Sequence, residues 1–175
     1  FQLNWLKISA SKLMDGGEAR ITDFPHSAVL QVLCVNAFGI YWRCGASIVN
    51  QRIMLTAAHC VEGCTNRDNI FASVGNRHSD EGTQSSVNIV YPHKKFHKFE
   101  MYNDIALLKL KTDLKLNNHI GRVALMKNPP YFEKAHVAGW GLVQVSFIDS
   151  ILSSSSVALL PQGCLLVGIL SMLIL

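Results

Sequence analysis

Charged side chains are scarce in this sequence of 175 residues. Only 16% of the residues are Asp, Glu, Lys or Arg, whereas 49% are hydrophobic, and the formal net charge is +4. A chain this rich in apolar residues can bury a core, so the composition excludes a disordered protein. Proteins that bind nucleic acid through phosphate contacts carry a stronger and more clustered positive charge. We therefore expect one folded domain and no nucleic-acid partner.

The sequence also lacks a hydrophobic run of the length that predicts a membrane-spanning helix. Its apolar, charge-free C-terminal end covers Leu165–Leu175, whereas a spanning helix needs about 20 apolar residues. The segment 161–163, which reads Pro-Gln-Gly, interrupts any extension of the run toward the N-terminus. A lipid-anchor signal after Ser153–Ser156 is not expected either, because the polar spacer that such signals contain is missing. An exposed apolar tail is instead an aggregation hazard.

Paired C-x2-C motifs, the strongest sequence signal of a zinc site, are missing as well. The odd number of cysteines leaves one thiol unpaired or paired outside the chain. Two interpretations are open: four of the cysteines form a loose four-sulfur zinc set, or the cysteines form disulfides. The spacing favours disulfides and an oxidising, extracellular compartment, so we expect a secreted protein without a metal or cofactor. The cysteines are Cys34, Cys44, Cys60, Cys64 and Cys164, of which the first four make up the zinc alternative.

Short segments of β-branched, aromatic and apolar residues, separated by Gly, Asn, Asp and Pro, recur through the first two thirds of the chain. Segments of this length and spacing predict an all-β fold, either an antiparallel barrel or a sandwich. One helical turn is expected near Ala57–Val61. The predicted strands are Ala28–Val35, Ile40–Asn50, Ile53–Thr56, Ile70–Val74, Ser86–Val90 and Ile105–Leu110.

Two short motifs contain residues that can carry chemistry. In LTAAHC, His59 lies among small residues directly before a cysteine, a pattern that fits either a core histidine or an active-site base. In NDIALLKL, Asp104 begins an almost wholly apolar strand, and buried carboxylates are rare unless they are paired. A histidine base needs a partner that fixes its tautomer and stabilises its protonated form. Asp104 is a candidate for that partner.

The order and spacing of these motifs resemble the trypsin and chymotrypsin-like serine proteases. Asp104 follows His59 by 45 residues, and a Gly-Trp-Gly motif follows at 139–141. The resemblance implies a double β-barrel, hydrolysis of peptide bonds in protein or peptide substrates, His59 as general base and Asp104 as its orienting partner. It also implies a disulfide between Cys44 and Cys60.

A second disulfide is expected between Cys34 and Cys64, by elimination and because the loops that bear them should be neighbours. The resemblance further suggests an activation cleavage site between Lys12 and Leu13. The cleavage site is a degraded match, because Leu-Met-Asp replaces the family's Ile-Val-Gly after the basic residue. An ordinary surface lysine at position 12 is the alternative. We expect residues 1–12 to be a propeptide remnant.

The family's Gly-Asp-Ser-Gly-Gly-Pro segment, which supplies the nucleophile and the oxyanion hole, does not occur in the sequence. The serines of Ser153–Ser156 lack flanking glycines and are interpreted as a linker. We therefore expect a C-terminally truncated, monomeric family member over 13–164, with a complete first barrel, an incomplete second barrel and a non-family tail over 165–175. Such a chain is expected to be inactive. The alternatives are a non-catalytic module that binds a partner protein and an incomplete gene product of an active protease.

A basic segment, PHKKFHK, covers Pro92–Lys98. It fits a solvated loop or a surface for heparin-like polyanions. Its histidines, His93 and His97, have a spacing that would suit a metal on a helix, but the surrounding strand pattern predicts no helix here.

Overall fold

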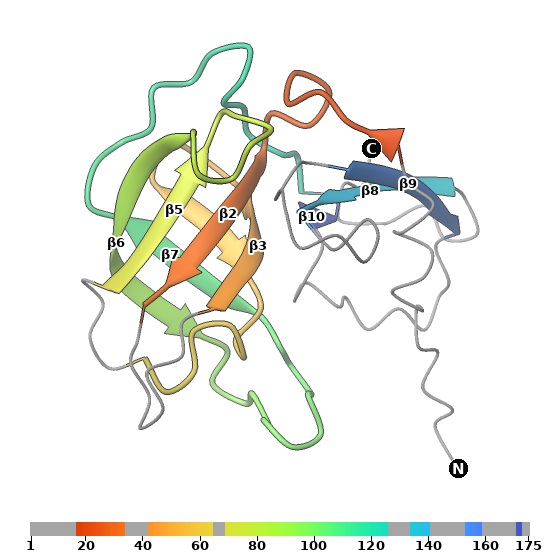
Figure 1. Cartoon of the computed structure of the whole chain (residues 1–175). Coiled ribbons are helices and arrows are strands. Elements are labelled where there is room, and N and C mark those ends of the chain that lie inside the picture. Colours follow the sequence, from red (N-terminus) through yellow and green to blue (C-terminus); the bar gives the residue numbers. More distant parts are fainter. Residues whose placement is uncertain are drawn as a thin grey trace.

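The computed structural model describes residues 17–33, 42–64, 69–125, 134–140, 153–158 and 171–172. All regular elements in these residues are β-strands, so the all-β prediction is correct. The strands form a closed barrel and a smaller four-stranded sheet beside it (Figure 1). The strands are β1 (Gly17–Glu18), β2 (Ser27–Val32), β3 (Trp42–Ile48), β4 (Ile53–Thr56), β5 (Ile70–Val74), β6 (Thr83–Pro92), β7 (Ala106–Leu110), β8 (Lys134–Gly139), β9 (Ser153–Ala158) and β10 (Ser171–Met172).

The barrel is antiparallel and has the strand order β2-β3-β4-β7-β6-β5. It closes because β2 pairs with β3 along one edge and with β5 along the other. Closure leaves no strand edge unpaired, which is how small β proteins avoid edge-to-edge association.

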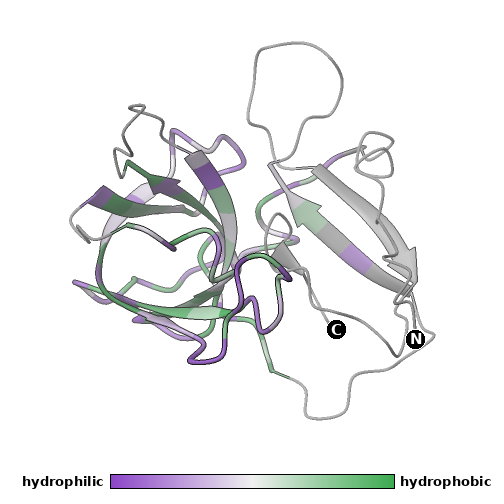
Figure 2. Cartoon of the chain, turned by 90° about the horizontal axis from the view of Figure 1, so that it is seen from below, coloured by the Kyte–Doolittle hydropathy of each residue, from purple (hydrophilic) through white to green (hydrophobic). Residues whose placement is uncertain are grey.

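Successive side chains of a strand lie on opposite faces, and those on the inner face fill the barrel with apolar groups. In β7, Ala106, Leu108 and Leu110 are buried, whereas Leu107 between them is exposed. Figure 2 shows hydrophobic and hydrophilic residues interspersed along the barrel strands. The largest fully buried side chains are Leu30, Ile48, Met54, Ile70, Leu108, Leu110, Val32, Val74, Val87, Thr56 and Cys60.

The smaller sheet has the order β1-β9-β8-β10. Ser153–Ser156 begin β9, which pairs with β8 and β1, so the interpretation of these serines as a linker is wrong. Serine has little intrinsic preference for strands, and here the backbone pairing with two neighbours overrides that preference. Trp140 follows β8 and donates from Nε1 to the Arg77 carbonyl, 2.6 Å away, which links the sheet to a barrel loop.

The segment after β4 is a pair of tight turns, so the expectation of a helical turn near Ala57–Val61 is wrong. The Val61 N–H donates to the Ala58 carbonyl at 3.1 Å, and the Cys64 N–H donates to the Val61 carbonyl at 3.4 Å. Bonds of this i→i+3 kind close turns and not the 13-atom rings of an α-helix.

Several predicted features lie outside the described residues. They include Lys12, Leu13, Cys34, Cys164 and the C-terminal tail apart from β10. Within the described ranges, the structure contains no helix with the length and apolar character needed to span a membrane.

Candidate active site

The pairing of β4 with β7 brings the two predicted site residues together. Thr56, the last residue of β4, lies opposite Ala106, the first residue of β7. In an antiparallel pair, the residues that follow one strand lie beside those that precede the other. His59 follows β4 and Asp104 precedes β7, so the strand register places both residues at the same end of the barrel.

The chain makes a tight turn directly before Asp104. Asn103 has φ 53°, a conformation that asparagine adopts more readily than most residues. Its side-chain amide donates to the Lys95 carbonyl at 2.9 Å, and its own carbonyl accepts the Ile105 N–H at 2.8 Å. These two bonds hold the chain in a tight turn at the entrance to β7.

Both oxygens of the Asp104 carboxylate contact His59. Oδ2 lies 2.6 Å from Nδ1 of the ring, and Oδ1 accepts the backbone N–H of His59 at 2.8 Å. The Asp104 side chain is only 6% exposed, whereas that of His59 is 32% exposed. The buried carboxylate thus fixes the ring and selects the tautomer with a proton on Nδ1, which leaves Nε2 as the acceptor. A ring held in this way can accept a proton from a nearby hydroxyl group.

The turn that bears His59 is fastened to β3 by three contacts. Cys44 and Cys60 form a disulfide, the pair that the family resemblance implies. The Trp42 indole N–H donates to the Cys60 carbonyl at 2.8 Å, and the buried Thr56 hydroxyl donates to the Gly45 carbonyl, also at 2.8 Å. Because these contacts flank His59 on both sides in sequence, they limit the movement of its backbone.

The other predicted site residues are only partly described. Cys64 is buried and disulfide-bonded, but Cys34, its predicted partner, lies outside the described residues. The pairing of Cys34 with Cys64 therefore stays a prediction. Ser153–Ser156 lie in the smaller sheet and not in the barrel that holds His59.

The two histidines of the basic segment have separate partners. The ring of His93 accepts the Lys95 N–H at 3.2 Å, and Nδ1 of His97 lies 3.8 Å from Glu100. The segment is exposed and is not helical. These contacts give no support to joint metal binding by His93 and His97.

His26 is a buried histidine that the sequence analysis did not identify. Burial lowers the pKa of His26 from 6.5 to about 4, and its Nε2 atom has no hydrogen-bond partner. Its neighbours in sequence, Pro25 and Ser27, give no signal of this burial, which arises from packing between distant segments.

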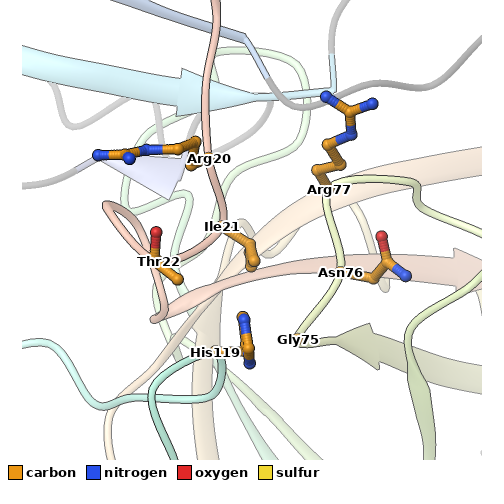
Figure 3. A pocket seen from close by; sticks show the side chains of 7 residues that line it. All are labelled: Arg20, Ile21, Thr22, Gly75, Asn76, Arg77 and His119. Carbon is orange, nitrogen blue, oxygen red and sulfur yellow. The ribbon is translucent and has the colours of Figure 1, made fainter.

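A hollow among the described residues has neither His59 nor Asp104 in its lining (Figure 3). It has a volume of about 370 Å³. Its two arginines are already paired: Arg20 with Asp23 at 3.2 Å and Arg77 with Glu18 at 3.2 Å. Paired arginines leave little net charge to attract an anion, so the hollow is a weak candidate site. It is lined by Arg20, Ile21, Thr22, Gly75, Asn76, Arg77 and His119.

Comparison with known proteins gives one consistent result. The trypsin family model matches residues 13–164. Hypodermin-B of Hypoderma lineatum is 33% identical over 138 residues, which cover 78% of this chain and 51% of the relative. A trypsin of Sarcophaga bullata is 30% identical over 132 residues, which cover 74% of this chain and 50% of the relative. The chain thus spans about half the length of these curated relatives.

The same fold occurs in a solved structure of a scabies mite inactivated protease paralogue. That structure has a TM-score of 0.72 and 23% sequence identity, and the match covers 83% of this chain and 61% of the other. At this identity the likeness describes the fold alone.

Proposed function

Because the chain belongs to the trypsin family of serine proteases, we propose that His59 is the general base of a peptide-bond-hydrolysing site and that Asp104 orients it. The observation that carries this proposal is the 2.6 Å contact between Nδ1 of His59 and the buried carboxylate of Asp104. Proteins or peptides are the proposed substrates.

In the proposed reaction, Nε2 of His59 takes the proton of an attacking hydroxyl group and later gives it to the leaving amine. Asp104 keeps its negative charge throughout and stabilises the imidazolium that forms between these two steps. The partial exposure of the His59 ring supports this assignment, because the base must reach a group outside the barrel.

We also propose that this chain by itself does not form an acyl-enzyme. Its 175 residues contain no Gly-Asp-Ser-Gly-Gly-Pro segment, and His59 without an activated hydroxyl cannot begin the covalent route. The chain should therefore not react with a fluorophosphonate probe under conditions that label a trypsin completely. Stoichiometric labelling of any of Ser153–Ser156 would contradict this part of the proposal.

A chimera tests His59 and Asp104 in a complete active site. In this chimera, the chain replaces the matching half of the Sarcophaga bullata trypsin. We expect hydrolysis of peptide substrates, with kcat about 10⁴-fold lower in the Asp104→Asn variant, as in related proteases that lose this carboxylate. His59→Ala should abolish turnover. A folded chimera without activity, or one equally active with His59→Ala, would contradict the proposal.

Secretion is proposed on the basis of the disulfides. Cys44–Cys60 is formed and Cys64 is also disulfide-bonded, and such bonds persist mainly in oxidising compartments. Cleavage between Lys12 and Leu13 stays a prediction, since both residues lie outside the described part of the chain.

A second candidate function is binding of a partner protein by the loop between β6 and β7. Phe99 in this loop is 84% exposed, and the Lys98 ammonium lies 5.2 Å from its ring centroid. The loop is fixed by a β-bridge between His97 and Tyr102. An exposed aromatic residue on a fixed, basic loop is a typical anchor for a partner with an acidic surface.

Photo-crosslinking tests this second candidate. A photoreactive phenylalanine at position 99 should capture a distinct protein from extracellular fluid of the source organism. The matched control carries the same group at Tyr91, which is 52% exposed on the barrel wall. Equal capture from both positions would contradict binding through the loop.

A further inference from the structure

Three potential metal ligands lie together beside the His59–Asp104 pair. The Sγ atoms of Cys44 and Cys60 and a ring nitrogen of His59 all lie within 4.8 Å of one another. The two sulfurs are joined in a disulfide, and a thiolate, not a disulfide sulfur, is the form of cysteine that binds metals well. The cluster is therefore blocked as a metal site as long as the disulfide is intact.

We propose that reduction of the Cys44–Cys60 disulfide converts this cluster into a zinc site. A dithiol reductant breaks the S–S bond, supplies two electrons and two protons, and is itself oxidised to a disulfide. Zn²⁺ then displaces the two thiol protons and binds both sulfurs as thiolates, together with Nε2 of His59. Water takes the fourth position, as in zinc sites with two cysteines, one histidine and one open position.

The distance between His59 and Cys60 already fits such a site. Nε2 of His59 lies 3.5 Å from Sγ of Cys60. With Zn–S bonds of about 2.3 Å and Zn–N bonds of about 2.0–2.1 Å, two ligands at a tetrahedral angle lie about 3.5 Å apart. A zinc ion can thus bind both atoms without a change in the position of the ring.

Rotation of the cysteine side chains can bring the Cys44 sulfur to the position of the third ligand. After reduction, the two sulfurs must separate to about 3.8 Å, the edge of a tetrahedron with Zn–S bonds of about 2.3 Å. The Cα atoms of Cys44 and Cys60 are 6.2 Å apart, so rotation of the side chains can provide this separation.

Asp104 prepares His59 for this role. Zinc-binding histidines usually donate their second ring N–H to a carboxylate, which fixes the tautomer and the ring orientation. Oδ2 of Asp104 lies 2.6 Å from Nδ1 of His59, so Nε2 carries the free electron pair. The His59 side chain is 32% exposed, which provides a route for the ion. The proposal does not depend on catalysis by His59, although a bound zinc ion would prevent His59 from acting as a base.

Cobalt binding to the full chain tests the proposal, with Co²⁺ as a spectroscopic probe for Zn²⁺. The chain is reduced with a dithiol, freed of reductant under anaerobic conditions and titrated with Co²⁺. We expect a thiolate-to-cobalt charge-transfer band and a bound ion in the reduced chain. Neither should occur in the oxidised chain.

His59→Ala separates this site from binding by the other cysteines, because all five cysteines remain in that variant. It should lose one bound ion per chain, and Asp104→Asn should weaken the affinity about 10- to 100-fold, as for other partners of zinc-bound histidines. Equal binding by the reduced wild-type and His59→Ala chains would overturn the proposal. Loss of near-ultraviolet circular dichroism on reduction would overturn it too, because the cluster requires the folded barrel.

A second variant removes the competing thiols. With Cys34, Cys64 and Cys164 replaced by serine, Cys44 and Cys60 are the only cysteines. If this variant folds, it should bind one Co²⁺ after reduction with two thiolate ligands. Absence of binding by the folded, reduced variant would overturn the proposal.

Discussion

At the scale of single residues, the candidate site depends on a carboxylate that the fold buries. Asp104 is only 6% exposed, and both of its oxygens contact His59. Other acidic residues form ion pairs at the surface, such as Asp113 with Arg52. Exposed pairs contribute about 0–1 kcal/mol to stability, whereas removal of a buried partner leaves other buried groups unpaired at a larger cost. The two kinds of residue should therefore respond differently to mutation.

Replacement of Asp104 by alanine should destabilise the fold. The backbone N–H and ring N–H of His59 would lose their acceptor, which should lower the free energy of unfolding by about 1–3 kcal/mol. Urea denaturation measures this loss, and Asp113→Ala, which removes an acid that is 61% exposed, is the matched control. Equal losses in the two variants would show that the Asp104 carboxylate is not held as described.

His26 should make the stability depend on pH. Burial lowers its pKa from 6.5 to about 4, so between these values the unfolded chain binds more protons than the folded chain. The free energy of unfolding should therefore fall as the pH falls, with this group contributing a loss of about 2 kcal/mol between pH 7 and pH 5. Denaturation of the wild-type and His26→Phe chains at both pH values measures this contribution. The same pH dependence in both chains would refute it.

His59 and Asp104 could be identified from the sequence because each lies in a short motif with a distinctive order and spacing. His26 could not be identified, because its burial depends on contacts between segments distant in sequence. One such contact is the bond from the Ile48 N–H to its carbonyl, 2.8 Å long. Local patterns do not specify contacts of this kind.

At the scale of elements, apolar strands were easier to predict than polar ones. The predicted segments Ile53–Thr56 and Ile70–Val74 agree with β4 and β5. In contrast, β6 begins at Thr83 and not at Ser86, because its polar first residues pair with the backbone of β5. Ser153–Ser156 form a strand for the same reason. Backbone pairing depends on neighbouring strands, whereas sequence patterns report mainly on side chains.

The turn after β5 requires glycine for two separate reasons. Gly75 has φ +82°, and a Cβ atom at this position would lie 2.7 Å from the Ile120 side chain. Gly63 has a similar φ of +75°, but nothing lies within 4 Å of its Cβ position. Comparison of the two positions therefore separates backbone strain from crowding.

Gly75→Ala should cost more stability than Gly63→Ala. Left-handed strain should cost about 1–2 kcal/mol in each variant, and crowding against Ile120 should add about 1–3 kcal/mol at position 75 alone. Thermal or urea denaturation of both variants measures the difference. Equal destabilisation would contradict the close packing of the turn against Ile120.

At the scale of the whole molecule, one closed barrel holds both His59, the proposed base, and Asp104, its proposed orienting partner. The chain spans about half the length of its curated relatives, and its residues include no Gly-Asp-Ser-Gly-Gly-Pro segment. The pairing of β4 with β7 thus brings His59 and Asp104 together within the closed barrel.

The Cys44–Cys60 disulfide should contribute to the stability of the barrel as a whole. It joins residues 16 apart in sequence, and closure of a loop of about 15 residues stabilises a fold by about 3 kcal/mol in chain-entropy estimates. The Cys44→Ser/Cys60→Ser variant should show a loss of this size in urea denaturation. A loss below about 1 kcal/mol would show that the contacts of Trp42 and Thr56 suffice to hold the turn.

The most direct test of the His59–Asp104 pair is ¹⁵N nuclear magnetic resonance of the His59 ring at a pH where the ring is neutral. A protonated Nδ1 and an unprotonated Nε2 are predicted, with the Nδ1 proton protected from exchange by the Asp104 carboxylate. The protection should disappear in the Asp104→Ala variant. A proton on Nε2 in the wild-type chain, or an Nδ1 proton that exchanges equally fast in both chains, would contradict the assignment of His59 as a base oriented by Asp104.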